Sequence, residues 1–309
     1  MSILIVFNNK DPKPWEKILK QKLMQADVSI FPQVKDPATV RFVLCWKPEK
    51  DILDRFPNLR VVQSVGAAVE HITRTQNLNE NIIISRIVDS RLSEDMWEFL
   101  LAAVMQHLKG LSHYSRQQQE KLWQQKEYRT VDQTTVSVLG LGKMGGLVAA
   151  KFARLGFKVK GWSASEKSIP KVEAYTGAEE LDGFLANSDI LINLLPLTHQ
   201  TEGILNRENL QKLKKGAYLI NVGRGEHLVE NDLTYLLDRE HLSGALLDVF
   251  TMEPLPECHS FWEHPKIQIT PHIASLTNIN SAADQVIENY RNFLEGKPLL
   301  NTVSLQKGY

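Results

Sequence analysis

The chain alternates short apolar runs with longer stretches in which apolar residues recur every three or four positions. Runs rich in Val, Ile and Leu are typical of strands buried on both faces, and the longer pattern is typical of amphipathic helices. Regular alternation of the two predicts an α/β fold with mainly parallel strands. The expected strands are 3–7, 28–31, 40–45, 61–64 and 82–85 in the first third, then 135–139, 158–162, 189–194, 217–222, 244–249 and 266–270.

Two long helical patterns, at about 93–118 and about 279–294, mark where the chain passes between domains. A glycine-rich turn at 140–145 follows the first strand of the second set. The domain that contains this turn is therefore an insertion in the middle of the chain. We expect one discontinuous domain, residues 1–98 with 279–309, and one inserted domain, residues 99–278.

Composition excludes several classes of protein. Lys plus Arg and Asp plus Glu both number 36, so the chain lacks the basic excess of a general nucleic-acid binder. Its two cysteines, Cys45 and Cys258, form neither a disulfide framework nor a metal-ligand spacing, so no metal site is expected. The N-terminus lacks a signal-peptide pattern, and no apolar window approaches the ~18 residues of a membrane span. These features favour a cytoplasmic protein with neither a nucleic-acid nor a membrane partner.

The segment from Gly140 to Gly145 reads Gly-Leu-Gly-Lys-Met-Gly and lies between an expected strand and a helical run. Strand, Gly-x-Gly-x-x-Gly and helix in this order form the dinucleotide-binding fingerprint. Gly140 permits the tight turn, Gly142 lets a pyrophosphate approach the backbone, and Gly145 lets the helix pack on the strand. The helical run that follows is expected from Gly146 to Leu155, and the free N–H groups and positive dipole end of its N-terminus favour phosphate. The sequence therefore predicts a nucleotide cofactor.

Three residues of reactive types, Arg224, Glu253 and His272, follow the last three expected strands. Open α/β sheets bind ligands beyond the carboxyl ends of their strands, so these side chains are expected to converge. Reduction of a 2-oxo acid needs a forked cation for the carboxylate and carbonyl oxygen, a proton donor, and a carboxylate that orients the donor. Taken singly, each residue also fits a structural role: a capping His, a loop Arg and an exposed Glu before Pro254.

These residues carry a resemblance. Nearly end to end, the chain resembles the D-isomer-specific 2-hydroxyacid dehydrogenase family, and within it the bacterial glyoxylate/hydroxypyruvate reductase A group. The similarity is densest in the glycine fingerprint and in Ile192 to Thr198, Asn221 to Gly225, Asp248 to Leu255 and Thr270 to Ser275. The resemblance implies an α/β protein of two doubly wound parallel-sheet domains, a Rossmann cofactor domain inserted in a flavodoxin-like substrate domain. It also implies a homodimer formed through the cofactor domain.

The resemblance assigns roles to the reactive residues. It implies that Arg224 clamps the substrate, that His272 is the general acid/base and that Glu253 is its partner. Asp248 is expected to meet the carboxamide of the nicotinamide. Further cofactor contacts are implied for Lys143, Met144, Leu195, Pro196, Thr201, Val222, Gly223, His272 and Ser275.

The first domain is expected to complete the substrate site. The resemblance implies that the loop 65–69 presents the N–H groups of Gly66 and Ala67 to the substrate carboxylate. Many relatives have Gly at the position of Ala68, so the loop is expected to differ slightly in shape. Trp46 aligns with a position near the substrate pocket, and a core Trp at a strand end is an equally good interpretation.

The choice of nicotinamide cofactor depends on the end of the second strand of the cofactor domain. An NAD-preferring site has an acidic residue about 20 positions past the glycines, where this chain has Ser163. Ser163, Ser165 and Lys167 can donate to a 2′-phosphate, and the resemblance also implies NADPH. The reductase group usually has an Arg, the strongest phosphate ligand, at the position that Ala164 occupies here. Glu166 can accept a hydrogen bond from the ribose instead, so NADH remains the alternative.

The predicted function is NAD(P)H-dependent reduction of a small 2-oxo acid, such as glyoxylate or hydroxypyruvate, with His272 as the proton donor. The first alternative is the same fold acting on a larger 2-oxo acid or on a phosphorylated hydroxy acid. Arg74, Arg86 and Arg91 are the candidate cations for a phosphate near the 65–70 loop, and they form no clear phosphate cluster. The second alternative is a nucleotide-sensing binding protein. Turnover of a 2-oxo acid distinguishes an enzyme from a sensor.

Overall fold

The computed structural model describes residues 2–79 and 81–303. Its contacts divide the chain into two compact units: one ends at Leu92 and resumes at Thr277, and the other covers Ser93–Leu276. The boundaries expected from the sequence lie a few residues later, after 98 and 278. In the described part of the chain, no helix combines the length and the hydropathy needed to cross a membrane.

The first unit contains a five-stranded parallel sheet in the order β2-β1-β3-β4-β5. This is the flavodoxin-like order expected for the substrate domain. Most side chains of its inner strands are buried, which explains their continuous apolar runs. Helices α1 and α9 contact each other. The elements are β1 (Ser2–Phe7), α1 (Lys13–Lys22), β2 (Asp27–Ile30), β3 (Val40–Trp46), β4 (Val61–Ser64), α2 (Glu70–Thr73), β5 (Ile83–Ser85) and α9 (Ile279–Leu294).

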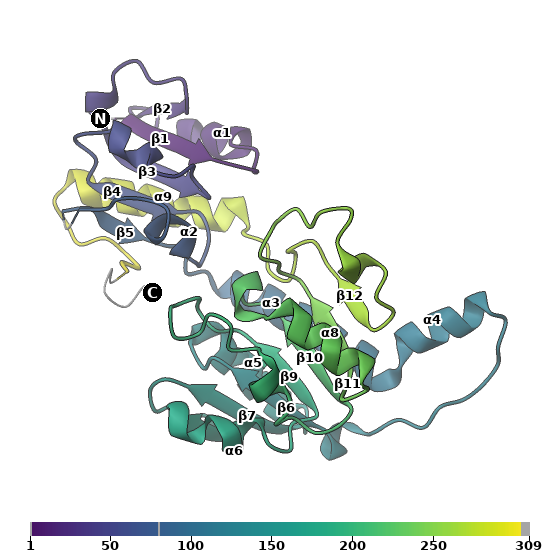
Figure 1. Ribbon diagram of the computed structural model, residues 1–309. Coiled ribbons are helices and arrows are strands. Elements are labelled where there is room, and N and C mark those ends of the chain that lie inside the picture. The colour runs from purple at the N-terminus through teal and green to yellow at the C-terminus, as the bar shows by residue number, and fades with distance from the viewer. Residues whose placement is uncertain (1, 80, 304–309) are drawn as a thin grey trace. The chain divides into compact units, whose positions relative to one another are not determined.

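The second unit contains a seven-stranded parallel sheet in the order β12-β11-β10-β9-β6-β7-β8, with helices packed against it (Figure 1). The strand order reverses between β6 and β9, which is the switch point where such sheets bind dinucleotides. The two doubly wound sheets confirm the expected fold class. Strand β8 was not expected from the sequence; it lies at the sheet edge, and none of its residues is buried. The elements are α3 (Ser90–Lys109), α4 (Leu111–Gln119), β6 (Thr135–Leu139), α5 (Lys143–Arg154), β7 (Lys158–Ser163), β8 (Val172–Thr176), α6 (Leu181–Leu185), β9 (Ile190–Asn193), α7 (Arg207–Leu210), β10 (Ala217–Asn221), α8 (Glu230–Asp238), β11 (Leu242–Leu247) and β12 (Ile267–Ile269).

The single long helix expected at about 93–118 is wrong. Gly110 adopts a left-handed conformation with φ of 66° and separates α3 from α4. Glycine takes this conformation without the penalty that a Cβ imposes, so it ends one helix and redirects the next. Figure 1 shows α4 and the chain that follows it extending away from the sheet as an arm, in which residues 120–130 are all exposed.

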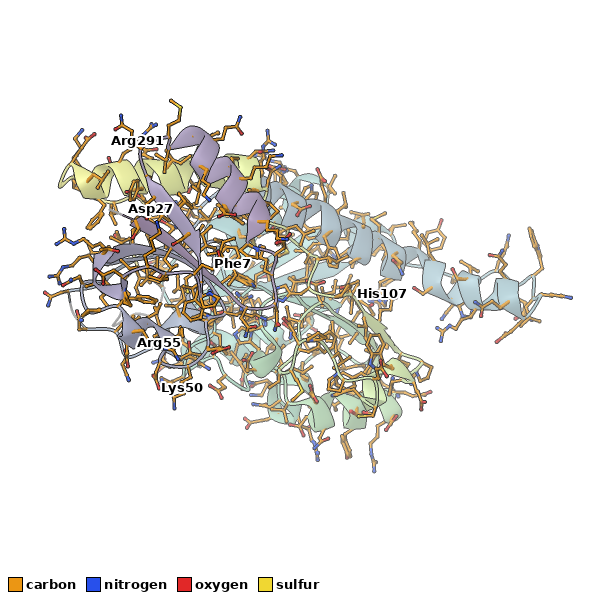
Figure 2. All side chains as sticks on the ribbon, turned by 90° about the horizontal axis from the view of Figure 1, so that it is seen from above. Phe7, Asp27, Lys50, Arg55, His107 and Arg291 are labelled. Atoms are coloured by element: carbon orange, nitrogen blue, oxygen red, sulfur yellow. The ribbon has the colours of Figure 1, made fainter. Side chains whose placement is uncertain are left out.

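His107, near the end of α3, is a titratable side chain held against the second sheet (Figure 2). Its ring stacks on that of Tyr218 of β10, with centroids 3.9 Å apart and planes inclined by 18°. Burial, with a smaller contribution from the positive charge of Lys126, lowers the pKa of His107 from 6.5 to about 4. The folded protein therefore holds this imidazole neutral at pH values where the unfolded chain binds a proton.

We expect this histidine to make the fold acid-sensitive. Below pH 6.5 the unfolded state binds a proton at His107 that the folded state does not bind. The free energy of unfolding therefore falls as the pH is lowered from 6.5 to the folded pKa of about 4. At pH 5 the loss is at most about 2 kcal/mol. Urea unfolding of wild type and His107→Phe at pH 7.5 and pH 5 measures it. The variant should lose less stability between the two pH values, and equal losses would contradict the prediction.

Candidate active site

The glycines of the fingerprint meet three different steric demands. Gly140 has φ of 104°, and a Cβ there would lie 2.8 Å from the carbonyl oxygen of Leu194. A Cβ on Gly145 would lie 1.8 Å from the carbonyl oxygen of Gly140, so the third glycine allows α5 to pack on the turn. A Cβ on Gly142, the N-cap of α5, would meet nothing within 4 Å. This open space beside a helix N-terminus fits a dinucleotide pyrophosphate.

The end of β7 presents the residues expected to choose the cofactor. Ser163 is buried, and its Oγ donates to the carbonyl oxygen of Ser165 at 2.7 Å. The hydroxyl proton of Ser163 is therefore already used, whereas the side chains of Ser165 and Lys167 are exposed. A 2′-phosphate contact from Ser163 stays a prediction, and Ser165 and Lys167 are the donors that this arrangement leaves accessible.

Arg224 follows β10 between two glycines that cannot be replaced without displacing other groups. A Cβ on Gly223 would lie 2.7 Å from Nδ2 of Asn193, and one on Gly225 would lie 2.0 Å from the carbonyl carbon of Phe250. The second contact brings the Arg224 turn against the backbone that follows β11. The spacing Gly-Arg-Gly is thus a packing requirement that places a guanidinium at the carboxyl edge of the sheet.

A buried polar network holds the backbone of Arg224. Its N–H donates to Nδ1 of His227 at 3.1 Å, and its carbonyl oxygen accepts from Nδ2 of Asn221 at 3.0 Å. Nδ2 of Asn193 lies 2.9 Å from both Oδ1 of Asn221 and Nδ1 of His227. These three side chains are fully buried. Because Nδ1 of His227 accepts these N–H groups, its proton lies on Nε2, 3.3 Å from the carbonyl oxygen of Pro196.

The structure brings His272 and Glu253 into direct contact. Nδ1 of His272 lies 2.8 Å and 3.0 Å from the two carboxylate oxygens of Glu253. The N–H of Phe250 donates to the same carboxylate at 3.1 Å and fixes its direction. Since the carboxylate accepts the Nδ1 proton, Nε2 of the partly exposed imidazole is left for proton transfer. His272 itself has φ of 55°, an uncommon conformation for a residue other than glycine.

Asp248, at the end of β11, organises the loop that carries His272. Its carboxylate accepts from Oγ1 of Thr270 at 2.6 Å and from the N–H groups of Ile273 and Ala274 at 2.8 and 2.9 Å. Burial raises the pKa of Asp248, and these donors act in the opposite direction. Only 1% of the residue is exposed. The structure thus gives Asp248 a positioning role that the sequence analysis missed, and its contact with a nicotinamide carboxamide stays a prediction.

We expect Asp248→Asn to slow catalysis while the site still binds its ligands. An amide has one acceptor oxygen, and its NH₂ group would face a backbone donor of Ile273 or Ala274. Loss of hydrogen bonds to a charged group costs about 2 kcal/mol of stability, and loosening of the loop should lower kcat about 10–100-fold. Thermal unfolding and steady-state kinetics measure the two effects. A variant with normal kcat would show that Asp248 does not control the loop.

The remaining predicted cofactor contacts lie at the same edge of the second sheet. Leu195 and Pro196 follow β9, and the N–H of Leu195 donates to Oδ1 of Asn193 at 3.2 Å. Oγ1 of Thr201 donates to the carbonyl oxygen of Pro196 at 2.7 Å, which closes this loop. Lys143 and Met144 begin α5, while Val222 and Gly223 follow β10 and Ser275 follows β12. The cofactor contacts of these residues stay predictions.

The predicted substrate residues of the first unit also follow its strands. Trp46 ends β3, and its ring would lie 2.8 Å from a Cβ on Gly66. The same ring lies 4.9 Å from that of His71, and Nζ of Lys10 lies 5.0 Å from it. Trp46 is half-buried. The side chain thus supports the loop expected to bind substrate, and direct contact with substrate stays a prediction, as it does for Ala67.

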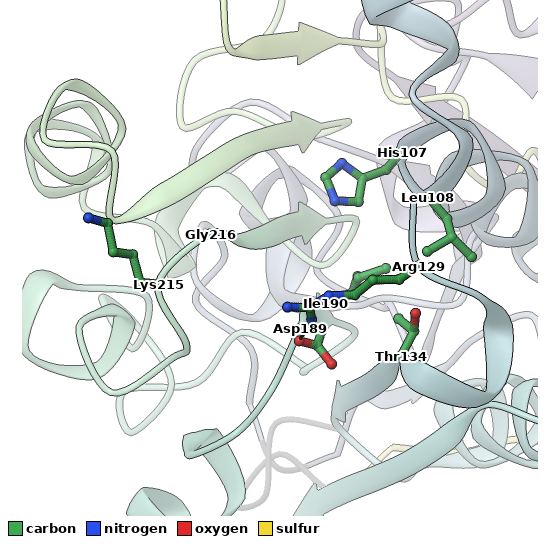
Figure 3. Close-up of a pocket in the computed structure, with 8 residues that line it drawn as sticks. All are labelled: His107, Leu108, Arg129, Thr134, Asp189, Ile190, Lys215 and Gly216. Atoms are coloured by element: carbon green, nitrogen blue, oxygen red, sulfur yellow. Dashed lines mark hydrogen bonds and ion pairs between the residues drawn. The ribbon is translucent and has the colours of Figure 1, made fainter. Parts of the chain in front are cut away.

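A pocket of about 220 Å³ lies at the opposite, amino edge of the second sheet (Figure 3). It contains Asp189, which precedes β9, bonds Arg129 and Lys214, and accepts from the N–H of Thr135 at 2.8 Å. These contacts fasten the returning arm to the sheet, and no residue expected for catalysis lines the pocket. Within the described residues, no group of His, Cys, Asp or Glu side chains is arranged to hold a metal ion.

Comparisons with known proteins found similar sequences and structures. A family model described as "D-isomer specific 2-hydroxyacid dehydrogenase, NAD binding domain" matches residues 101–274. The glyoxylate/hydroxypyruvate reductase A of Yersinia enterocolitica is 36% identical over 100% of both chains. The protein of the same name from Serratia proteamaculans is also 36% identical over 100% of both chains.

Solved structures with the same architecture include two with a bound nicotinamide cofactor. A D-isomer-specific 2-hydroxyacid dehydrogenase from Xanthobacter autotrophicus, in complex with NADPH and MES, superposes with a TM-score of 0.92. It is 36% identical, and the match covers 100% of this chain and 99% of that one. An NADPH-dependent glyoxylate/hydroxypyruvate reductase from Sinorhizobium meliloti, in complex with NADP and sulfate, has a TM-score of 0.93 and 34% identity over 100% of both chains.

Proposed function

The chain belongs to the D-isomer-specific 2-hydroxyacid dehydrogenase family, and from this premise we propose that it is an NADPH-dependent reductase of glyoxylate and hydroxypyruvate. The observation that carries the proposal is the contact between His272 and Glu253, whose segments follow two neighbouring strands. Arg224 follows the next strand of the same sheet. A proton donor, its orienting carboxylate and a forked cation are the groups that reduction of a 2-oxo acid needs.

Each residue of this group has a distinct task. The guanidinium of Arg224 binds the carboxylate and the carbonyl oxygen of the substrate and stabilises the negative charge that develops on that oxygen. The cofactor, when bound, supplies the hydride for the carbonyl carbon. Protonated His272 delivers a proton from Nε2 to the carbonyl oxygen, so hydride and proton together give the 2-hydroxy acid. Glu253 accepts the Nδ1 proton and holds the imidazole in this orientation.

The cofactor is proposed to be NADPH because the end of β7 offers phosphate donors and a neutral residue at the ribose position. Lys167 and Ser165 are exposed there, and the carboxylate that an NAD-preferring site needs at residue 163 is absent from the sequence. Two solved relatives are described with NADPH or NADP, which supports the same choice. If the protein used NADH, Glu166 would be the residue that accepts a hydrogen bond from its ribose.

Initial rates test the proposal. Oxidation of NADPH and of NADH is followed with glyoxylate, hydroxypyruvate, pyruvate and a bulkier 2-oxo acid. The proposal expects turnover of the first two acids with preference for NADPH. Preference for the bulky acid would retain the chemistry and overturn the substrate assignment. Tight cofactor binding without turnover of any acid would overturn the assignment as an enzyme and favour the nucleotide-sensing binding protein.

A cytoplasmic location is part of the proposal. The reaction consumes a reduced nicotinamide cofactor, which is a cytoplasmic metabolite. The two cysteines, Cys45 and Cys258, are free thiols, as is usual in a reducing compartment. Fractionation of cells with an antibody against the chain tests this assignment.

We also propose a homodimer in which the arm covers a second copy of the chain. The arm carries four large apolar side chains on an otherwise polar segment: Leu111, Leu122, Trp123 and Tyr128. Trp123 is 97% exposed, which is unusual for the largest side chain. Burial of such residues is what commonly drives association of identical subunits.

Light scattering coupled to size exclusion tests the dimer. The wild type should have twice the chain mass of 35.1 kDa. The double variant Leu122→Asp, Trp123→Asp should elute as a monomer because two charges enter the proposed interface. Met24→Asp is the matched control, since Met24 is an apolar side chain that is 91% exposed in the first unit. A dimeric double variant would place the interface elsewhere.

A further inference from the structure

The loop after β4 is anchored through successive carbonyl oxygens. The carbonyl oxygen of Gly66 accepts the N–H of Ile87 at 2.9 Å. The carbonyl oxygen of Ala67 accepts Nη1 of Arg86 at 3.3 Å. Both donors belong to the segment that leaves β5, so one neighbouring strand end fixes two consecutive peptide groups.

Ser64 holds the loop from its other side. Its Oγ accepts the N–H of Gly66 at 3.2 Å and donates to the carbonyl oxygen of Ala68 at 2.8 Å. The N–H of Gly66 is therefore turned inward and already bonded. This arrangement argues against Gly66 as one of the two donors to a substrate carboxylate, the role that the resemblance implied for it.

The anchored carbonyl groups determine where the free N–H groups point. In a trans peptide the C=O and the following N–H point in opposite directions. The N–H of Ala67 is thus directed away from Ile87, and the N–H of Ala68 is directed away from Arg86. No hydrogen bond between described residues uses either N–H group. Two adjacent N–H groups without a partner suit the two oxygens of a carboxylate.

Arg86 is the side chain on which the second of these peptides depends. It follows the end of β5, where its own N–H donates to the carbonyl oxygen of Asn301 at 3.2 Å. It is half-buried, and burial lowers the pKa of its guanidinium, which nevertheless remains charged. Among the described residues, its guanidinium has one hydrogen-bond acceptor, the carbonyl oxygen of Ala67. A charged donor holds a peptide carbonyl more strongly than a neutral one.

We propose that Arg86 is a positioning residue that orients the Ala67–Ala68 peptide, so that the N–H groups of Ala67 and Ala68 receive the substrate carboxylate. The inference rests on the proposed function, which supplies a 2-oxo acid as the ligand. It replaces the pair Gly66 and Ala67 with the pair Ala67 and Ala68. It also gives a role to a cation that the sequence analysis considered only as a phosphate ligand.

Kinetics of two substitutions at one position test the inference. Arg86→Met keeps the length and apolar stem but removes the donor, so KM for glyoxylate should rise about 10–100-fold, as for loss of one charged hydrogen bond. Arg86→Lys retains a charged donor and should restore most of the loss. In both variants kcat and the NADPH dissociation constant should change less than about 3-fold. Arg60→Met, at an exposed arginine of the same unit, is the control and should match wild type.

Amide spectra separate positioning from direct contact. In protein labelled with ¹⁵N-alanine, the amide signals of Ala67 and Ala68 should shift on titration with oxamate, a non-reducible analogue. In Arg86→Met the signal of Ala68 should move even without ligand and lose its response. A raised KM with an unchanged Ala68 response would mean that Arg86 touches substrate itself, and an unchanged KM would also overturn the inference. Oxamate shifts without turnover in wild type would instead count against the proposed function alone.

Discussion

His272→Gln should reduce kcat for glyoxylate reduction about 10²–10⁴-fold, which is the contribution usual for a positioned general acid. This corresponds to a rise in the barrier of about 3–5 kcal/mol. Glutamine retains a polar group of similar reach near Glu253 but cannot deliver a proton. Cofactor affinity, measured by fluorescence titration with NADPH, should remain near that of wild type because the fingerprint lies after a different strand, β6.

The pH profile gives the mechanistic signature of this substitution. Reduction requires the protonated imidazole, so the wild-type rate should fall on the basic side when chemistry limits turnover. The same limb should disappear in His272→Gln. Glu253→Gln should also be slow, because an amide NH₂ directed at Nδ1 imposes the wrong tautomer on His272. A variant at residue 272 that keeps the basic limb would assign the titration to another group.

A second histidine pair serves as the matched control. His264 lies 3.5 Å from Asp238 and precedes β12, at the amino edge of the same sheet. His264→Gln also removes an imidazole from a carboxylate, but at the opposite end of the strand from the catalytic pair. Its kcat should stay near that of wild type. A large loss in this control would show that the effect at His272 reflects damage to the sheet.

The location of the candidate catalytic residues could be predicted because parallel sheets make sequence order informative. Arg224, Glu253 and His272 each follow a strand, and because these strands pair in parallel, their carboxyl ends lie at one edge of the sheet. The glycines at 140 and 145 could be predicted because a Cβ at either position would clash with backbone atoms, and Gly142 because the motif keeps space there for a pyrophosphate. Periodicity and these local rules therefore sufficed for an α/β fold with parallel strands and for the position of these residues at one edge of the sheet. Their roles were implied by the family resemblance and stay predictions.

The supporting residues were not predictable in the same way. Asn193 and Asn221 end buried strands, and nothing in their spacing shows that both side chains turn toward His227. The only available signal was polarity: two Asn residues interrupt apolar strand ends and a His follows three residues after Arg224. Their partners are distant in the chain, so the network is specified by tertiary packing rather than by local pattern.

Short-range conformation caused the other differences. The apolar spacing of 93–118 continues through Gly110, so periodicity alone predicts one helix there. The left-handed conformation of that glycine is decided locally and redirects the arm. Ser163 likewise occupies the expected position, but its hydroxyl turns back to Ser165. Sequence position located each residue correctly and left the direction of its side chain or backbone open.

Arg224→Gln should lower kcat/KM for glyoxylate about 10³-fold, because it removes the charge and the fork that bind both the carboxylate and the developing oxyanion. Arg224→Lys restores the charge without the bidentate geometry, so its kcat/KM should be about tenfold higher than that of Arg224→Gln. Since the guanidinium acts more strongly on the transition state than on the ground state, kcat should fall in addition to the rise in KM. Arg239→Gln, at an exposed arginine in the same unit, is the control. If Arg224→Gln changed KM alone, Arg224 would bind substrate without stabilising the transition state, and the charge on the carbonyl oxygen would need another partner.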